Sequence, residues 1–274
     1  MLEIADINDF ESLKAWLEDQ PREVSVWIVT RAAARVLPMW WHAVLTEDWA
    51  RQRELTALPV LRSLSISSVA AMRPTDDIRS AADTSATSAT NAAQAASTAY
   101  ATTIVVDAAS AATNAAAAAT NAAAKATTAA AAAYATNCAA TTNADAWSPI
   151  RADAEQATHG QLPDALPLWP DGAGPLSKEW AQIKAQLGKS SNLSDWQFWI
   201  DWYDAQLAGR TMLPDPKRTW DMLEQIALID PETWDAGPET VNPNIREIWD
   251  MYKDNASASG HAADPEPVSE DAKS

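Results

Sequence analysis

Apolar residues recur at helical spacing close to the N-terminus. Leu13, Trp16 and Leu17 line one face of a short predicted helix. Asn8 and Glu11 stand where a capping box would begin this helix. The pattern therefore predicts a capped, amphipathic helix near the start of the chain.

The next run, residues 23–45, is the most apolar part of the sequence. Its β-branched residues would also suit a strand, but three alanines between Arg31 and Arg35 favour a nearly buried helix. We expect this helix to end before Pro38, because an internal proline removes a backbone hydrogen bond. The two arginines lie one turn apart and could clamp an anion, although exposed ion pairs with acidic residues of the N-terminal segment are favoured. A third helix is predicted over residues 58–71.

The middle of the chain repeats every seven residues. From Thr113 the sequence reads TNAAAAA, TNAAAKA, TTAAAAA, and no glycine or proline occurs between Pro74 and Pro149. Alanine is the best helix former, and small apolar residues at alternating steps of four and three are typical of a helix-packing seam. The predicted interaction seam consists of Ala115, Ala119, Ala122, Ala126, Ala129 and Ala133.

A second copy of the repeat begins at Thr90, out of phase with the copy at Thr113. Between the copies lies a bulkier patch, Tyr100 and residues 104–106, where a turn or kink is predicted. One continuous helix would be about 100 Å long at about 1.5 Å per residue, which is far longer than a typical globular helix. We therefore favour a packed hairpin or bundle. A stretch with so few charges should pack against another helix, within the chain or on a second copy.

Composition changes at residue 160, after which proline and tryptophan become frequent. Ser177 and Gly188 bracket one predicted helix. Three pairs of an Asp or Asn with a following proline predict the starts of further helices, at Asp215-Pro216, Asp230-Pro231 and Asn242-Pro243.

Together these patterns predict an all-α protein. An alanine-rich pair or bundle of long helices is flanked by an N-terminal and a C-terminal helical module. The predicted segments are residues 1–73, 74–149, 150–254 and 255–274, and the last of these is a disordered acidic tail.

The 274 residues carry a formal net charge of -17, with a pI near 4.4. Nucleic acid and anionic lipid both require a basic surface, so neither is an expected partner. The single cysteine, Cys138, excludes an internal disulfide. No membrane span and no signal peptide are predicted, and we expect a cytoplasmic protein.

The C-terminal module holds the residues most suggestive of a site. Trp199 and Trp202 lie three positions apart, so at least one should be buried, and an exposed aromatic face would bind a partner. Asp201 and Asp204 lie one turn apart and could serve a metal or glycoside hydrolysis, although a solvated acidic face is favoured. The sequence has no HExxH, cysteine cluster, P-loop, GxGxxG or GxSxG motif, so no cofactor or metal is predicted.

Both ends of the chain resemble a group of uncharacterised bacterial proteins. Residues 196–210 read WQFWIDWYDAQLAGR and are followed by ALID-x3-W-x2-GPETVN-x2-I, which is similar to the C-terminal part of that group. The N-terminal segment FESLKAWLEDQPREVSVWIVTRAAARVLP and the alanine-rich middle are similar as well. The resemblance implies no activity and no catalytic residue.

These observations favour a noncatalytic interaction, scaffold or assembly protein that binds a protein partner or a second copy of itself. One alternative is ice binding, because alanine-rich helices with regularly spaced threonines resemble antifreeze helices, although those repeat every eleven residues. The other alternative is a hydrolase that uses the acidic, Trp-rich C-terminal module.

Overall fold

The computed structural model consists of helices joined by turns and loops, and the residues that it describes contain no strand. This confirms the predicted all-α fold class. The structure describes residues 2–97, 104–124, 147–160, 162–170, 172, 174–189 and 193–259. Within these ranges, no helix combines the length and the apolarity needed to cross a bilayer.

The N-terminal part contains η1 (Ile4–Asp6), α1 (Phe10–Glu18), α2 (Arg22–Thr46), α3 (Asp48–Gln52) and α4 (Leu58–Met72). A capping box starts α1, one position later than predicted from Asn8 and Glu11. The Asp9 carboxylate accepts a hydrogen bond from the Ser12 N–H at 2.8 Å, and the Asp9 N–H donates to Ser12 Oγ at 3.1 Å. The Ser12 hydroxyl thus takes the place of the expected glutamate side chain as the acceptor for the backbone N–H of the N-cap residue.

Helix α2 does not end before Pro38 but continues to Thr46. Pro38 leaves the carbonyl of Ala34 without its usual donor in the helix, at a cost of about 3 kcal/mol. Trp40 and Trp41 follow the proline and are at most 1 % exposed. Burying two such side chains offsets that cost, at about 1.5–3 kcal/mol for each large apolar side chain. Tertiary packing therefore overrides the local signal.

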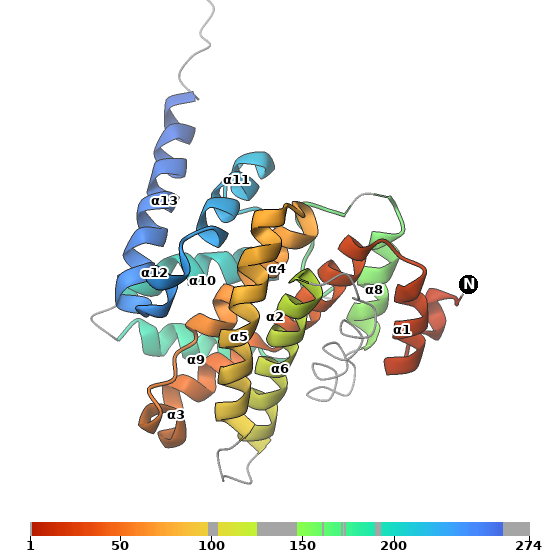
Figure 1. Ribbon diagram of the computed structural model, residues 1–274, viewed down its shortest axis with the longest axis horizontal. Coiled ribbons are helices and arrows are strands. Elements are labelled where there is room, and N and C mark those ends of the chain that lie inside the picture. Colours follow the sequence, from red (N-terminus) through yellow and green to blue (C-terminus); the bar gives the residue numbers. More distant parts are fainter. Residues whose placement is uncertain are drawn as a thin grey trace, which may run out of the picture.

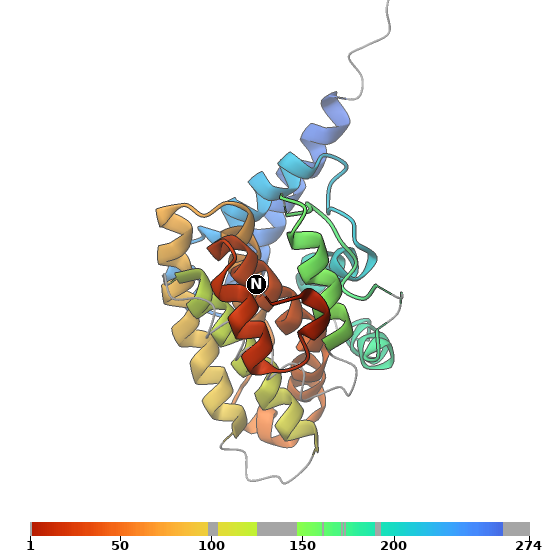
Figure 2. The same ribbon diagram turned by 90° about the vertical axis from the view of Figure 1, so that its right-hand side faces the viewer.

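The alanine-rich stretch forms a hairpin of two long helices, α5 (Asp76–Ser97) and α6 (Ile104–Ala124). They pack along each other and lie side by side in both views (Figures 1 and 2). Helix α5 ends at Ser97 and α6 begins at Ile104, so the predicted turn near the bulkier patch falls on residues outside the described part of the chain. The described part of the stretch is therefore a folded bundle and not one rod.

Helix α6 is enclosed by three neighbours, α5, α2 and α4. Ala115, Ala119 and Ala122 of the predicted seam are fully buried, and so are Ala116 and Ala123 on adjacent faces. The buried surface is therefore wider than the predicted seam, because methyl side chains allow three helices to approach one. The other seam residues lie outside the described part of the chain: Ala126, Ala129 and Ala133.

The C-terminal part contains α8 (Trp147–Ala157), α9 (Ser177–Leu187), α10 (Leu193–Ala208), α11 (Pro216–Ala227), α12 (Pro231–Asp235) and α13 (Pro238–Ser259). Two of the predicted starts are confirmed, because Asp215 and Asp230 are the N-caps of α11 and α12. Their carboxylates accept hydrogen bonds from Lys217 N at 2.9 Å and from Thr233 N at 2.8 Å.

The last helix begins earlier and ends later than predicted. It starts at Pro238, so Pro243 lies inside it, and it continues to Ser259, past the predicted start of the tail at residue 255. Asn242 does not cap a helix, because its buried side chain accepts a hydrogen bond from Trp199 Nε1 at 3.0 Å. Residues 260–274 of the predicted tail lie outside the described part.

The N-terminal and C-terminal helices share one hydrophobic core with the hairpin. Trp41 of α2 contacts Trp180 of α9 and Trp196 of α10, with ring centroids 5.5 and 5.7 Å apart. This aromatic contact, together with the packing of α2 on α6, places α2 between the hairpin and the C-terminal helices.

Replacing Ala122 with Leu should destabilise the protein by about 1–3 kcal/mol or more, because the extra methylenes must displace the helices that enclose α6. Ala124, half-buried two residues further on, is the matched control. Ala124→Leu makes the same chemical change with more room, so it should cost clearly less. Urea unfolding of both variants measures the difference, and equal losses would contradict the enclosed packing of α6.

Candidate functional site

Two arginines of α2 are buried in the core together with a single carboxylate. Arg31 and Arg35 are 5 % and 4 % exposed, and Asp153 of α8 is 1 % exposed. Arg31 Nε donates to one oxygen of Asp153 at 2.9 Å, and Arg35 Nη2 donates to the other at 2.6 Å. The predicted exposed ion pairs are therefore wrong, because the arginine face of α2 is covered by α8 and the segment after it.

The same guanidinium groups hold the backbone of the segment that follows α8. Arg31 Nη1, Arg31 Nη2 and Arg35 Nε donate to three consecutive carbonyl oxygens, those of residues 166–168, at 2.9, 2.6 and 2.7 Å. Burial lowers the pKa of Arg35 below its usual value, and the charge of Asp153 opposes that shift. One carboxylate cannot satisfy two guanidinium groups, so carbonyl oxygens supply further acceptors. Arg35 Nη1 is buried without a hydrogen-bond partner among the described residues.

Gly209 allows the end of α10 to press against this segment. It adopts φ +61°, and the Arg210 N–H donates to the Ala205 carbonyl at 3.0 Å, as in a Schellman motif. A Cβ at Gly209 would lie 2.2 Å from Cδ of Pro167. Only glycine therefore fits between α10 and the segment, and this contact fixes where Arg210 leaves the helix.

A pocket of about 460 Å³ opens between this segment, α9 and α10. Its principal lining residues are Trp169, Trp180, Lys184, Tyr203, Asp204 and Arg210. Trp180 and Tyr203 meet edge to face, with ring centroids 4.7 Å apart. Burial raises the pKa of Tyr203, which keeps its phenol neutral. The pocket therefore has aromatic walls and a few charged groups.

The charged groups of the pocket differ in their contacts. Asp204 accepts a hydrogen bond from Trp180 Nε1 at 2.6 Å, and Lys184 Nζ lies 3.1 Å from each of its carboxylate oxygens. The ammonium of Lys184 also lies 5.5 Å from the centroid of the Trp180 ring. Arg210 is exposed, and its guanidinium has no hydrogen bond or ion pair to any described residue.

Sequence patterns did not single out Trp180, Lys184 or Arg210, because they come from two separate stretches that only the fold brings together. One signal was available. Arg210 directly follows Gly209 at the end of the segment WQFWIDWYDAQLAGR, and a residue after a C-cap glycine is often held in a defined place.

The two predicted aromatic interaction residues belong to the core. Trp199 is fully buried and Trp202 is 1 % exposed. The two rings lie edge to face at 6.0 Å, and Trp199 also contacts Trp234 at 6.3 Å. The prediction that at least one of them is buried is confirmed, and neither ring offers an exposed face for a partner.

The acidic residues of the C-terminal module are not gathered in one place. Asp201 accepts a hydrogen bond from Gln197 at 2.7 Å, while Asp204 lines the pocket. Glu224 pairs with Arg73. Within the described ranges, no group of three His, Cys, Asp or Glu side chains could hold a metal ion.

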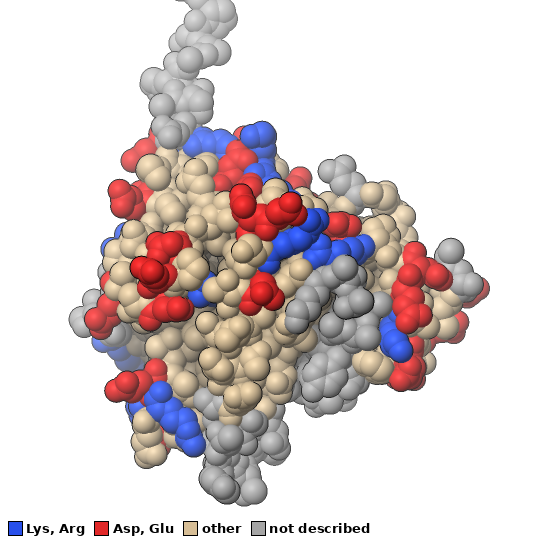
Figure 3. All heavy atoms as spheres, viewed as in Figure 1, with Lys and Arg blue, Asp and Glu red and all other residues tan. Residues whose placement is uncertain are grey.

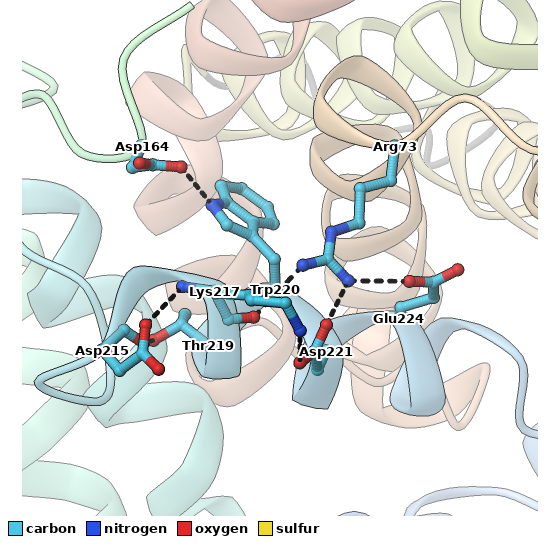
Figure 4. Close-up of polar contacts among 8 residues, drawn as sticks. All are labelled: Arg73, Asp164, Asp215, Lys217, Thr219, Trp220, Asp221 and Glu224. Carbon is cyan, nitrogen blue, oxygen red and sulfur yellow. Dashed lines mark hydrogen bonds and ion pairs between the residues drawn. The ribbon is translucent and has the colours of Figure 1, made fainter.

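Arg73 joins the end of α4 to α11 (Figure 4). Its Nη1 lies 2.6 Å from Asp221 Oδ1 and 2.9 Å from Glu224 Oε2, and its Nη2 donates to the Lys217 carbonyl at 3.2 Å. The same helix is tied to the segment after α8, where Trp220 Nε1 donates to an oxygen of Asp164. The polar contacts of Figure 4 therefore hold α11 against the end of α4 and against the segment after α8.

The described part of the surface presents few large apolar side chains to a partner. Among the described residues, the large hydrophobic side chains that are exposed are Leu228 and Met251. Figure 3 shows charged side chains over the C-terminal helices, α3 and α1, whereas the surface over the second half of α5 is uncharged. The sequence agrees, since no charged residue occurs in α5 after Asp83.

The chain matches no protein-family model, no curated protein and no solved structure. Its site is therefore assigned from its own geometry.

Replacing Asp153 with Asn should destabilise the protein by about 3–5 kcal/mol, because two buried guanidinium groups lose their only carboxylate. The control is Asp48→Asn, which removes an exposed ion pair with Arg51 and should change stability by about 1 kcal/mol or less. Denaturant unfolding of the two variants is the measurement. If Asp153→Asn loses as little stability as Asp48→Asn, the ion pairs of Asp153 with Arg31 and Arg35 contribute nothing to folding.

The Arg73 contacts predict a pH dependence. Hydrogen bonds from Arg73 and Lys217 lower the pKa of Asp221, so its stabilising effect is fully present above the unfolded value of about 3.9 and is lost as pH falls through the folded value. The difference in unfolding free energy between the wild type and Asp221→Asn should therefore be greatest near neutral pH and shrink below about pH 4. Urea titrations between pH 7 and pH 2 test this, and a constant difference would refute it.

Proposed function

We propose that the protein is a noncatalytic binding protein whose ligand occupies the pocket between α9 and α10. One observation carries the proposal: aromatic walls surround about 460 Å³, and a few charged groups converge on that space. Ligand sites in proteins typically have about 300–1,000 Å³, mostly apolar walls and a small number of placed polar groups. We therefore place the proposed binding site at the Trp-rich end of the chain and not at the alanine seam.

A binding role fits the pocket better than hydrolysis does. Among the described lining residues Asp204 is the one carboxylate, and it is already engaged by Trp180 and Lys184. Glycoside hydrolysis normally requires two carboxyl groups that flank the scissile bond. Asp201, the other candidate, does not line the pocket.

The threonine repeat gives no support to ice binding in the described part of α6. Thr113 and Thr120 are fully buried, and their hydroxyls donate to the carbonyls of Ser110 at 2.9 Å and Ala116 at 2.7 Å. A flat row of exposed threonines would be needed on this helix. The seam alanines are likewise covered by the chain's own helices, so they support the scaffold that carries the pocket.

A thermal-shift screen of chemically diverse small molecules tests the proposal. Ala208 is exposed at the end of α10 and lines the pocket, so Ala208→Phe should fill the space without entering the core. Compounds that raise the melting temperature of the wild type should lose that effect in this variant.

The matched control is Ala236→Phe, which places the same side chain at an exposed position that does not line the pocket. This variant should keep the wild-type shifts. Hits that survive in Ala208→Phe, or the absence of any hit with the wild type, would overturn the proposal.

A further inference from the structure

We infer that the protein has a second binding site, a groove at the ends of α1, α4 and α8 that takes a small molecule with an ammonium group on an aliphatic chain. This inference goes beyond the proposed function, because the described lining residues of the groove and those of the pocket between α9 and α10 are all different. Three features of the groove carry it: its apolar floor, the helix ends that meet there, and the acceptors that have no donor.

The groove has the size and the floor of a small-molecule site. Its volume is about 610 Å³, which lies within the range of about 300–1,000 Å³ that is typical of ligand sites. Val24, Ala71 and Ala157 line it and are buried, while Met72 and Leu162 line it and are partly buried. Such a floor suits an aliphatic chain, because each methylene group that it removes from water favours binding.

Three helices end at the groove. Helix α1 ends at Glu18, α4 at Met72 and α8 at Ala157, and residues at or directly after each of these ends line the groove. The carbonyl oxygens of the last turn point beyond the end of a helix and give it a partial negative charge of about half a unit. Helix α2 begins here instead, and Glu23 lies in its first turn. Negative helix ends therefore outnumber the positive one.

The groove has hydrogen-bond acceptors without donors. The carbonyl oxygens of Ala71, Met72 and Ala157 accept no hydrogen bond from a described residue. The carboxylates of Asp19 and Glu23 also line the groove, and they form no hydrogen bond or ion pair with a described residue. An ammonium group offers three N–H donors and no acceptor. Its charge and its donors therefore match this set of groups.

The arginines next to the groove in sequence are directed elsewhere. Arg22 donates to two carbonyl oxygens at the end of α6, and Arg73 pairs with two carboxylates of α11. The described lining residues include no lysine or arginine. Gln161, which interrupts the described residues at the groove, carries no charge. A neutral or anionic ligand would leave both carboxylates without a partner, so a cation is favoured.

Isothermal titration calorimetry of the full-length protein with hexylamine, hexanol and hexanoate tests the inference, because the three probes share a chain and differ in the head group. Hexylamine should bind about 10-fold or more tightly than hexanol, as expected for hydrogen bonds to charged groups. Hexanoate should bind more weakly than hexanol. A double variant, Asp19→Asn with Glu23→Gln, should lose the preference for hexylamine and keep the wild-type affinity for hexanol.

The matched control is a second double variant, Asp6→Asn with Glu11→Gln. It removes the same two charges from exposed positions that do not line the groove, so it should keep the preference for hexylamine. The comparison separates binding in the groove from the general attraction of an acidic chain for a cation.

Equal binding of hexylamine and hexanol, no binding of any probe, or an equal preference for hexylamine in the two double variants would each overturn the inference. Binding of Nα-acetyl-lysinamide without binding of hexylamine would also overturn it, because the groove would then accept a lysine of a protein partner and not a free amine. None of these results decides the function proposed for the pocket between α9 and α10, which the screen with Ala208→Phe tests separately.

Discussion

The burial of two guanidinium groups beside one carboxylate is the constraint on which the rest of the structure depends. Removing Arg31 and Arg35 from water is costly unless most of their donors find acceptors, and among the described residues Arg35 Nη1 has none. Asp153 supplies two acceptors, and the carbonyls of residues 166–168 supply three more at hydrogen-bond distance. The segment after α8 is therefore bound to α2 through its backbone, and that segment forms one wall of the pocket.

The alanine hairpin fills the centre of the helical bundle. Because its side chains are mostly methyl groups, α6 can be enclosed by α2, α4 and α5 at once. The buried hydroxyls of Thr113 and Thr120 bond back to carbonyls of their own helix, so neither is left unpaired. The repeat is thus explained by packing within the chain, and the binding surface lies elsewhere.

Sequence patterns correctly predicted the features that depend on interactions between residues close together in the chain. The all-α class, the hairpin and the caps at Asp215 and Asp230 follow from propensity, spacing and capping, which act within a few residues. The errors arise where distant contacts dominate. Pro38 was expected to end a helix that the burial of Trp40 and Trp41 continues. Arg31 and Arg35 were expected in solvent because nothing in their neighbourhood reveals a carboxylate more than a hundred residues away. The pocket was missed for the same reason, since its walls come from separate stretches.

The contrast between the pocket and the rest of the chain bears on selectivity. The charges of the pocket and those of the rest of the chain act at different ranges. Salt screens exposed charges beyond about 8–10 Å, whereas charges in contact within a pocket are screened much less. A small molecule in a pocket experiences mainly the charges that line it. A polyanion such as nucleic acid extends far beyond a pocket of this size and meets a chain with a formal net charge of -17. The net charge of the chain therefore disfavours a polyanion much more strongly than it disfavours a small molecule in the proposed pocket.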